Sequence, residues 1–439
     1  MQKLPKRQLF YILIALGIAD LLGAIDVTGV NIALPQITRH LNIPITVSQW
    51  IPNAYLLVLV ASLIFMGKIG DIIGAKKLYV IGLIIFGLAS LGLGFTNSVP
   101  LLIALRAIQG LGTAILFTMP MSIIAHLWEK REKAFAITAS FFAAGMLIGP
   151  VIGGLLTSVN IGNYYGWHLL FLLNIPIIAI GIYVTLKLVP PISGKDKQYI
   201  DYLSLILLIS GLSLIVLSFS NINRLFGVLG LALLISLYVY EKKNQDPMLD
   251  FTLFNNRTFL SANAVSFVSM IAVIGMSFVL TFYLQNTLNW NSTEAGLALL
   301  PVPIVTGIFS VIGSNIKSWK TGAIISSILT TAGLLVLVFV SPDIPYYFGI
   351  LPAMILLGAG SGILMTLIFA AILGSAPINK SGSASGILNT LQQLGGLIGI
   401  AVVSSLVLNY KTSFFLLAVI SLLGIFAAFF VKNQNRIYK

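Results

Sequence analysis

The sequence predicts an all-α integral membrane protein with fourteen transmembrane helices. Of its 439 residues, 58% are hydrophobic and only 8% are charged, and the mean hydropathy is +1.02. Soluble domains carry about 25% charged residues, so this composition excludes a soluble globular fold. The basic N-terminus leads into an apolar run that is too long for a signal peptide and has no small-residue cleavage site, which indicates a retained first span.

The spans follow from length, because a helix needs about 20 apolar residues to cross a hydrocarbon core about 30 Å thick. By this criterion the spans lie near residues 10–33, 47–66, 78–96, 99–122, 134–157, 166–187, 200–220, 224–240, 259–282, 294–315, 321–340, 346–372, 383–408 and 412–431. The pair 200–220 and 224–240 is the weakest, because only NINR joins its members and the second is short. A tight hairpin satisfies both lengths, and losing both would leave the remaining topology unchanged.

Positive charge supports this count, because Lys and Arg accumulate in short cytoplasmic loops. With both termini in the cytoplasm, 21 of the 25 Lys and Arg residues fall on the cytoplasmic side. An error of one span before the middle of the chain would destroy this asymmetry. The net charge of +13 is therefore a topological signal of a multi-pass plasma-membrane protein, and we expect no nucleic-acid partner.

Two halves of nearly equal length predict an internal repeat. The first six spans occupy roughly residues 9–187 and the last six roughly 259–431, and the fifth span of each half is rich in glycine. Small residues let helices approach closely in a bilayer. We therefore expect an N-terminal six-helix bundle over 1–190, a linker with an inserted two-helix hairpin over 191–245, and a C-terminal six-helix bundle over 246–439.

Five motifs resemble those of a known family. GKIGDIIGAKK (67–77) resembles the loop between the second and third spans of the major facilitator superfamily. LIALRAIQGLGTA resembles its fourth-span motif, and GMLIGPVIGG its fifth-span antiporter motif. IDVTGVNIALPQI and SGSASGILNTLQQLGG resemble the first and thirteenth spans of the fourteen-span drug:proton antiporter branch. The second half departs from the pattern, because GSNIKSWK lacks the aspartate of the signature loop.

Three ionisable residues within the spans are candidates for proton coupling, because charge at membrane depth is costly and marks function. Asp20 and Asp26 share the first span, about 9 Å apart along the axis and roughly 120° apart around it. Asp26 matches the antiporter motif, so we expect it to face the central cavity and to exchange a proton for a cationic substrate. Arg106 needs a partner, either Asp20 or Asp26, and either senses protonation or forms a purely structural ion pair. Asp20 is equally well explained as that partner or as a second proton site.

Glu294 has two readings at the start of the tenth span. Ser292 or Thr293 can cap the helix, and a glutamate in the first turn complements the helix dipole. Alternatively, Glu294 reaches the outer cavity as a second titrating group. Among polar and aromatic residues, a minority is expected to contact a flat lipophilic cation. The predicted substrate-binding side chains are Asp26, Asn31, Tyr55, Gln109 and Phe282.

The signature loop and the fifth span carry conformational roles in the resembled family. The loop is expected to bias the inward and outward states as a latch, in which Asp71 binds a lysine or a helix N-terminus of the opposite bundle. The other reading is a topogenic turn with a solvated carboxylate. The latch residues are Gly67, Asp71, Gly74, Lys76 and Lys77. The fifth-span residues, expected at a flexible interface between bundles or simply in close packing, are Gly145, Gly149, Pro150, Gly153 and Gly154.

The resemblance implies a proton-coupled secondary exporter of lipophilic, cationic drugs that works by alternating access. A same-fold exporter of a tetracycline–metal complex, a lipid or an endogenous metabolite is the alternative, and sodium in place of protons and the oligomeric state are left open. Neither an enzyme nor a cofactor is expected. We find no nucleophile and base constellation, no GxxxxGKS loop, no cysteine, and no histidine spacing that predicts a metal site.

Overall fold

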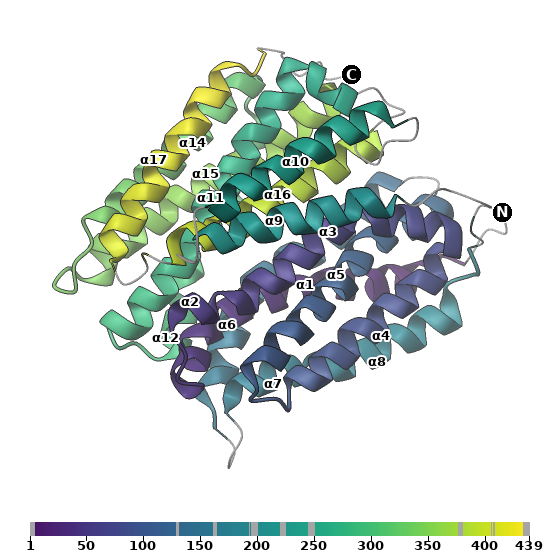
Figure 1. Cartoon of the computed structure of the whole chain (residues 1–439), viewed down its shortest axis with the longest axis horizontal. Helices are drawn as coiled ribbons and strands as arrows, with labels where there is room; N and C mark the ends of the chain where they lie inside the picture. Colours follow the sequence, from purple (N-terminus) through teal and green to yellow (C-terminus); the bar gives the residue numbers. More distant parts are fainter. Residues whose placement is uncertain are drawn as a thin grey trace. The chain divides into compact units, whose positions relative to one another are not determined.

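The protein is built from helices (Figure 1). A computed structural model describes residues 5–128, 131–160, 165–192, 194, 201–219, 225–244, 251–375, 381–404, 406 and 409–432. The chain folds into two compact units. We call Met1–Ile209 with Asn291–Leu297 the N-terminal unit, and Ser210–Trp290 with Ala298–Lys439 the C-terminal unit. The boundary between the units, at Ile209 and Ser210, lies within the segment 191–245 predicted as linker and hairpin, and the three-part division stays a prediction.

The helices of the first half begin with the long first span and end before the predicted linker. They are α1 Lys6–His40, α2 Ile45–Ser48, α3 Trp50–Ile73, α4 Ala75–Leu93, α5 Val99–Leu127, α6 Arg131–Ser158, α7 Gly166–Leu172 and α8 Asn174–Leu188. The predicted hairpin forms α9 Tyr202–Phe219 and α10 Leu225–Lys243. The connector NINR between them lies outside the described residues.

The helices of the second half follow a short 3-10 turn. The elements are η1 Phe251–Asn255, α11 Arg257–Phe282, η2 Tyr283–Thr287, α12 Ser292–Leu299, α13 Pro301–Ser314, α14 Trp319–Val338, α15 Tyr346–Ser375, α16 Ser381–Ser404 and α17 Tyr410–Phe429. The predicted span 294–315 is thus two helices, α12 and α13, that meet where Pro301 begins the second. Proline favours the first position of a helix because it lacks the amide proton that would go unpaired there.

Thirteen helices within the described residues are long and apolar enough to cross a membrane. Every predicted span is helical within the described residues, but 47–66, 166–187 and 294–315 each run over two helices, and the apolar stretch of α9, Tyr202–Ser218, is too short to be counted among the thirteen. The sequence pointed to α10 as the short member of the hairpin, and this was wrong, because α10 runs for 19 residues. Gly211 and Gly230 bring α9 and α10 close together, since a Cβ on either would meet the other's carbonyl oxygen.

The internal repeat is confirmed by the way that each unit pairs its helices. In the N-terminal unit α1 packs on α6 and α8, α5 packs on α3 and α4, and α4 packs on α8. In the C-terminal unit the corresponding helices pair in the same order: α11 with α16 and α17, α15 with α13 and α14, and α14 with α17. The glycine-rich fifth span therefore lies against the first span in each half.

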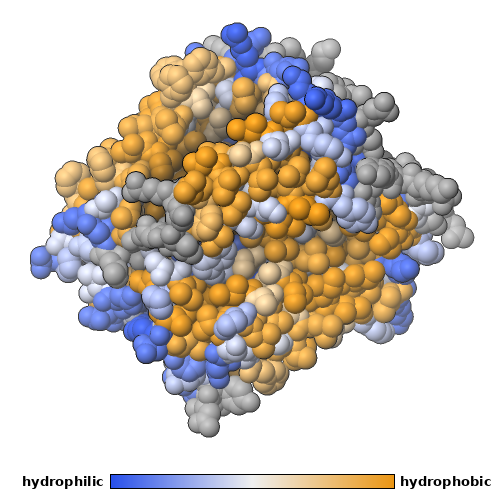
Figure 2. Space-filling view, in the orientation of Figure 1, coloured by the Kyte–Doolittle hydropathy of each residue, from blue (hydrophilic) through white to orange (hydrophobic). Residues whose placement is uncertain are grey.

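The outward faces of the helices are apolar, as lipid contact requires. Figure 2 shows hydrophobic residues over α4, α8, α9 and α10, with hydrophilic residues gathered near the helix ends. Leu88 of α4, Tyr183 of α8 and Ile235 of α10 are each more than 60% exposed. Exposed apolar area on this scale is typical of a membrane surface and not of a soluble domain.

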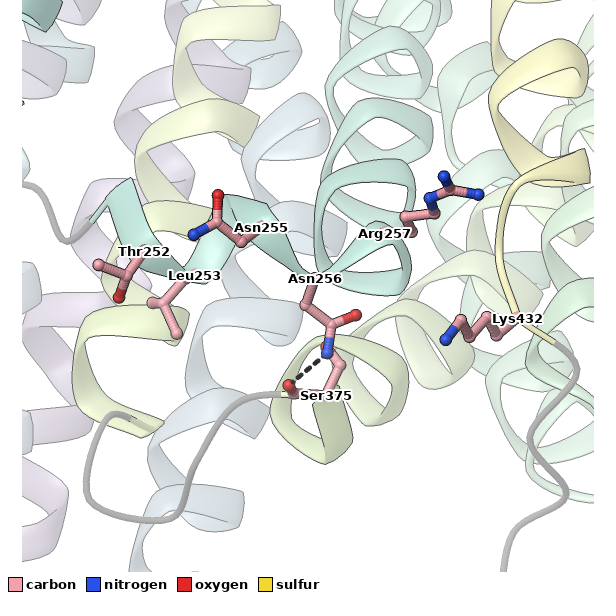
Figure 3. Close-up of a pocket in the computed structure, with 7 residues that line it drawn as sticks. All are labelled: Thr252, Leu253, Asn255, Asn256, Arg257, Ser375 and Lys432. Carbon is pink, nitrogen blue, oxygen red and sulfur yellow. Dashed lines mark hydrogen bonds between the residues drawn. The ribbon is translucent and has the colours of Figure 1, made fainter.

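The ends of α11, α15 and α17 meet on one side of the C-terminal unit (Figure 3). Asn256 caps α11, because its side-chain oxygen accepts hydrogen bonds from the amides of Thr258 and Phe259. Its amide nitrogen donates to the Ser375 carbonyl at 2.9 Å. The start of α11 and the end of α15 therefore lie on the same side, as the alternating topology predicted.

Candidate functional site

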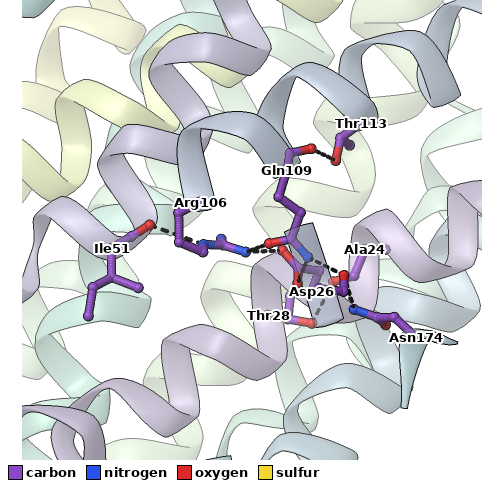
Figure 4. A network of polar contacts seen from close by, with 9 residues as sticks. Ala24, Asp26, Thr28, Ile51, Arg106, Gln109, Thr113 and Asn174 are labelled. Carbon is purple, nitrogen blue, oxygen red and sulfur yellow. Dashed lines mark hydrogen bonds and ion pairs between the residues drawn. The ribbon is translucent and has the colours of Figure 1, made fainter. Parts of the chain in front are cut away.

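A buried ion pair joins α1 and α5 inside the N-terminal unit (Figure 4). Arg106 Nη1 lies 2.5 Å from Asp26 Oδ2, and each side chain is only 1% exposed. Arg106 Nε donates to the Ile51 carbonyl of α3 at 3.1 Å. Of the two partners that the sequence allowed for Arg106, the structure thus selects Asp26.

Gln109 forms hydrogen bonds with both Arg106 and Asp26. Its side-chain oxygen accepts from Arg106 Nη1 at 2.6 Å, and its amide nitrogen donates to Asp26 Oδ1 at 3.1 Å. The same nitrogen lies 2.9 Å from Ser90 Oγ. Both carboxylate oxygens of Asp26 are therefore engaged within the unit, and a cation that bound Asp26 directly would have to displace Arg106 or Gln109.

The guanidinium of Arg106 lies over aromatic rings. Its central carbon is 4.2 Å from the ring centroid of Tyr55 and 5.9 Å from that of Phe171. A desolvated cation–π contact of this kind contributes about 2 kcal/mol. Gly110 makes the arrangement possible, because a Cβ at this position would lie against the Tyr55 carbonyl oxygen. Tyr55, predicted to contact substrate, therefore supports the ion pair in this structure.

Two members of this network were not predicted from the sequence. Ser90 of α4 receives the Gln109 amide, and Asn174 Nδ2 of α8 lies 3.3 Å from Ser90 Oγ. Both residues are buried, at 0% and 2% exposure. The only available signal was a polar residue inside an apolar span, which identifies the residue but not its partner. The network extends the Asp26 site across α1, α5, α4 and α8.

The remaining candidates for coupling and substrate contact lie apart from this network or have separate partners. Asp20 is half-buried on α1, and within the described residues it has no ion pair. Asn31 is half-buried on α1 five residues after Asp26. Phe282 belongs to the C-terminal unit, where it packs on Phe278 with ring centroids 5.1 Å apart. Their predicted roles in transport stay predictions.

Glu294 forms a capping box with Asn291. The Glu294 amide donates to Asn291 Oδ1 at 2.8 Å, and the Asn291 amide donates to Glu294 Oε2 at 2.9 Å. The cap was expected from Ser292 or Thr293, and this was wrong, since Asn291 supplies the side-chain oxygen. Reciprocal bonds of this kind satisfy two amides that a helix start would otherwise leave unpaired. The carboxylate is exposed, and its titrating role stays a prediction.

The signature loop packs against the end of α8. Gly74 adopts φ 97°, which favours glycine, and ends α3 directly before α4. Lys76 Nζ donates to the carbonyls of Leu186 and Val189, at 3.0 and 2.5 Å, where α8 ends. A lysine at this position satisfies carbonyls that the helix leaves free and complements the helix dipole. Lys76 is therefore a structural anchor, and its topogenic role stays a prediction. Asp71, Lys77 and the unobstructed Gly67 keep their latch role as a prediction.

The glycines of the fifth span bring α6 against α1. A Cβ would meet the Leu21 carbonyl oxygen at Gly145, the Thr28 side chain at Gly149 and the Gly29 backbone at Gly153. These three positions serve close packing within the N-terminal unit.

Gly154 and Pro150 of the same helix contact a different partner. A Cβ at Gly154 would meet Ser292, and one at Gly296 would meet the Pro150 carbonyl oxygen. Thr293 Oγ1 also donates to the Gly154 carbonyl at 3.2 Å. The start of α12, from the second half of the sequence, therefore packs on α6 within the N-terminal unit.

Two of the histidines, His40 and His168, lie close together at the end of α1, with ring centroids 6.4 Å apart. Trp167 Nε1 donates to His40 Nδ1 at 3.2 Å and stacks on His168 with ring centroids 3.6 Å apart. His168 Nε2 lies 3.1 Å from Asn97 Oδ1. This cluster ties α1, α7 and the α4–α5 loop together. Within the described residues, no three His, Cys, Asp or Glu side chains are close enough to share a metal ion.

Known proteins resemble the chain along most of its length. The Major Facilitator Superfamily profile matches residues 16–400 and 323–437. The riboflavin transporter RibZ of Clostridioides difficile is 29% identical over 411 residues, which cover 91% of this chain and 88% of that protein. The multidrug efflux pump LfrA of Mycolicibacterium smegmatis is 29% identical over 411 residues, which cover 90% of this chain and 80% of that protein.

A solved structure shows the same fold. The crystal structure of a POT family transporter in complex with a thioalcohol-conjugated peptide has a TM-score of 0.71 and 17% sequence identity, and the match covers 95% of this chain and 94% of that one. The motifs, the repeated helix pairing and the full-length match agree. The chain therefore belongs to the major facilitator superfamily of membrane transporters, with drug-efflux proteins among its relatives.

Proposed function

We propose that the protein is a proton-coupled secondary exporter of lipophilic, cationic drugs in the cell membrane. The observation that carries this proposal is the ion pair of Asp26 and Arg106, buried inside the N-terminal unit of a transporter fold. An ionisable pair at membrane depth is costly to maintain, and its retention points to a role in the transport cycle.

The pair links protonation to helix packing because its two members titrate differently. Arg106 keeps its charge, whereas Asp26 can take up a proton. A proton on Asp26 removes the counter-charge of Arg106 and leaves it with the Ile51 carbonyl, the Gln109 amide oxygen and the Tyr55 ring. Asp26 belongs to α1, and the groups left around Arg106 belong to α3 and α5, so the proton changes the relative stability of two arrangements of these three helices.

Transport then follows the alternating-access scheme of two repeated units. A proton from outside binds Asp26, and substrate and proton compete through the position of Arg106. The exposed Asp71 in the signature loop acts as the latch of one state, and Asp20 and Glu294 are secondary proton sites. Sodium is the alternative coupling ion.

A second cargo is favoured by one specific similarity. RibZ, named as a riboflavin transporter, is 29% identical over 91% of this chain. A planar, largely uncharged metabolite is therefore the second candidate substrate class, and it uses the same fold and the same ion pair. The multidrug efflux pump LfrA, at the same identity, supports the first candidate.

Transport by purified protein in liposomes tests the proposal. We expect an imposed pH gradient to drive ethidium movement in the wild type, and Asp26→Asn to abolish gradient-driven transport. The control Asp343→Asn changes an exposed loop carboxylate and should leave transport unchanged. Gradient-driven transport retained in Asp26→Asn would refute the coupling assignment, and riboflavin movement without ethidium movement would select the second cargo.

A further inference from the structure

A polar hollow of about 560 Å³ lies where the ends of α11, α15 and α17 meet in the C-terminal unit. Its lining residues are Thr252, Leu253, Asn255, Asn256, Arg257, Ser375 and Lys432 (Figure 3). Two of these are basic, and none of these described lining residues is acidic. We propose that the hollow binds the phosphate of an anionic phospholipid headgroup. This inference does not depend on the direction or the cargo of transport.

The two basic side chains are free to bind an anion. Within the described part of the chain, no hydrogen bond or ion pair engages the guanidinium of Arg257 or the ammonium of Lys432, and both residues are exposed. Figure 3 shows them on the same side of Asn256. Lys76 and Arg106, by contrast, are already engaged by protein oxygens. Arginine presents a planar set of donors that matches a phosphate, and lysine adds a point charge.

Hydrogen bonds around the hollow hold together the backbone segments that carry these two cations. Asn256 joins the start of α11 to the end of α15 through its bond to the Ser375 carbonyl at 2.9 Å. The Lys432 amide donates to Thr258 Oγ1 at 3.4 Å, which ties the end of α17 to α11. Arg257 and Lys432 therefore project from segments that are bonded to each other, so an anion between them costs little ordering of the backbone.

Exposed apolar residues close in sequence to Arg257 and Lys432 favour a lipid over a soluble anion. Leu260, one turn after Arg257, is 49% exposed, and Phe429 and Phe430, just before Lys432, are 55% and 54% exposed. Phosphate alone gains nothing from such side chains, whereas acyl chains attached to a phosphate can lie along them. A further cation, Lys320, lies 5.9 Å from the Phe429 ring centroid.

The predicted position of the hollow, on the cytoplasmic side of the membrane, also favours an anionic lipid. The topology predicted from the Lys and Arg distribution places all three helix ends on the cytoplasmic side, where anionic lipids gather and basic pockets between helices bind their headgroups. Each basic residue near such a surface contributes about 1 kcal/mol, which corresponds to about fivefold in affinity for one side chain and roughly thirtyfold for two.

Native mass spectrometry of the full chain in detergent tests the proposal. The titrants are dioctanoyl-phosphatidylglycerol, the phosphatidylcholine of equal chain length, and inorganic phosphate. The test variant is Arg257→Gln/Lys432→Gln. The matched control is Arg39→Gln/Lys411→Gln, which removes two exposed charges predicted on the opposite side.

The wild type should bind phosphatidylglycerol in preference to phosphatidylcholine, without displacement by equimolar phosphate. The test variant should bind phosphatidylglycerol roughly thirtyfold more weakly and the control variant as the wild type does. If the double variant fails to fold, Lys432→Gln, which lies beyond the end of α17, should show a loss of about fivefold. Unchanged binding in the test variant, or an equal loss in the control, would overturn the site. Displacement by equimolar phosphate would overturn the lipid assignment and indicate a soluble anion.

Discussion

The buried pair of Asp26 and Arg106 predicts a strong, non-additive effect on stability. Asp26→Asn keeps the shape of the side chain but removes its charge. The guanidinium of Arg106, with its side chain only 1% exposed, then loses its counter-charge and keeps only neutral acceptors: the Ile51 carbonyl, the Gln109 oxygen and the amide oxygen introduced at position 26. Removing one partner of a buried pair costs about 3–5 kcal/mol in the free energy of unfolding.

The other corners of the double-mutant cycle separate the charge effect from the loss of shape. Arg106→Gln should lower the free energy of unfolding less than Asp26→Asn does. Without Arg106, the carboxylate of Asp26 can take up a proton, whereas the guanidinium of Arg106 cannot lose one when Asp26 is replaced. The double variant leaves only neutral groups, so it should recover most of the loss, with a coupling energy of about 3 kcal/mol. An exposed control, Asp71→Asn, should stay within about 0.5 kcal/mol of the wild type.

The assay is equilibrium unfolding by SDS in mixed micelles, followed by tryptophan fluorescence. A cost below about 1 kcal/mol for Asp26→Asn, or a double variant that loses the sum of the two single losses, would refute the predicted coupling. Either result would mean that the pair is solvated or mobile in the folded protein, and that protonation of Asp26 has little effect on helix packing.

Three further substitutions test the packing around the site and the signature loop. Gly110→Ala places a methyl group against the Tyr55 carbonyl oxygen, so it should cost about 1–3 kcal/mol in unfolding and slow liposome transport; unchanged values for both would contradict the predicted close contact. Lys76→Gln should lower stability by about 1 kcal/mol because the last carbonyls of α8 lose their donor, whereas the neighbouring Lys77→Gln should change nothing in the same unfolding assay. Trp167→Phe keeps the ring stack but loses the hydrogen bond to the imidazole at the end of α1, so it should cost about 1 kcal/mol by unfolding, and an unaltered midpoint would count against that bond.

The helices themselves could be predicted from the sequence, because a bilayer demands long apolar segments with internally paired backbone. Each predicted span is helical within the described residues, and the predicted repeat appears in the shared pairing order of the two units. The exact lengths and breaks of the helices were harder to predict from the sequence. The break between α12 and α13 and the short α9 depend on local backbone geometry. Hydropathy averaged over a span does not report this geometry.

The site was predicted in part. Motif spacing identified Asp26, Arg106 and Gln109, but sequence alone left both Asp20 and Asp26 as partners of the arginine, since the choice depends on how two helices are rotated toward each other. Ser90 and Asn174 are 84 residues apart, and no local pattern brings them together. The histidine cluster and the contacts of Lys76 with the end of α8 could not be predicted for the same reason, because they also join residues that are far apart in the sequence.

Proton release on substrate binding tests the central claim most directly. Ethidium is added to detergent-solubilised protein in weakly buffered solution, and the pH change is recorded alongside ethidium binding by fluorescence. The account predicts that the wild type releases protons on binding, that Asp26→Asn releases none, and that Asp343→Asn behaves as the wild type does. Equal proton release by the wild type and Asp26→Asn would contradict the account, because the exchanged proton would then reside on another group.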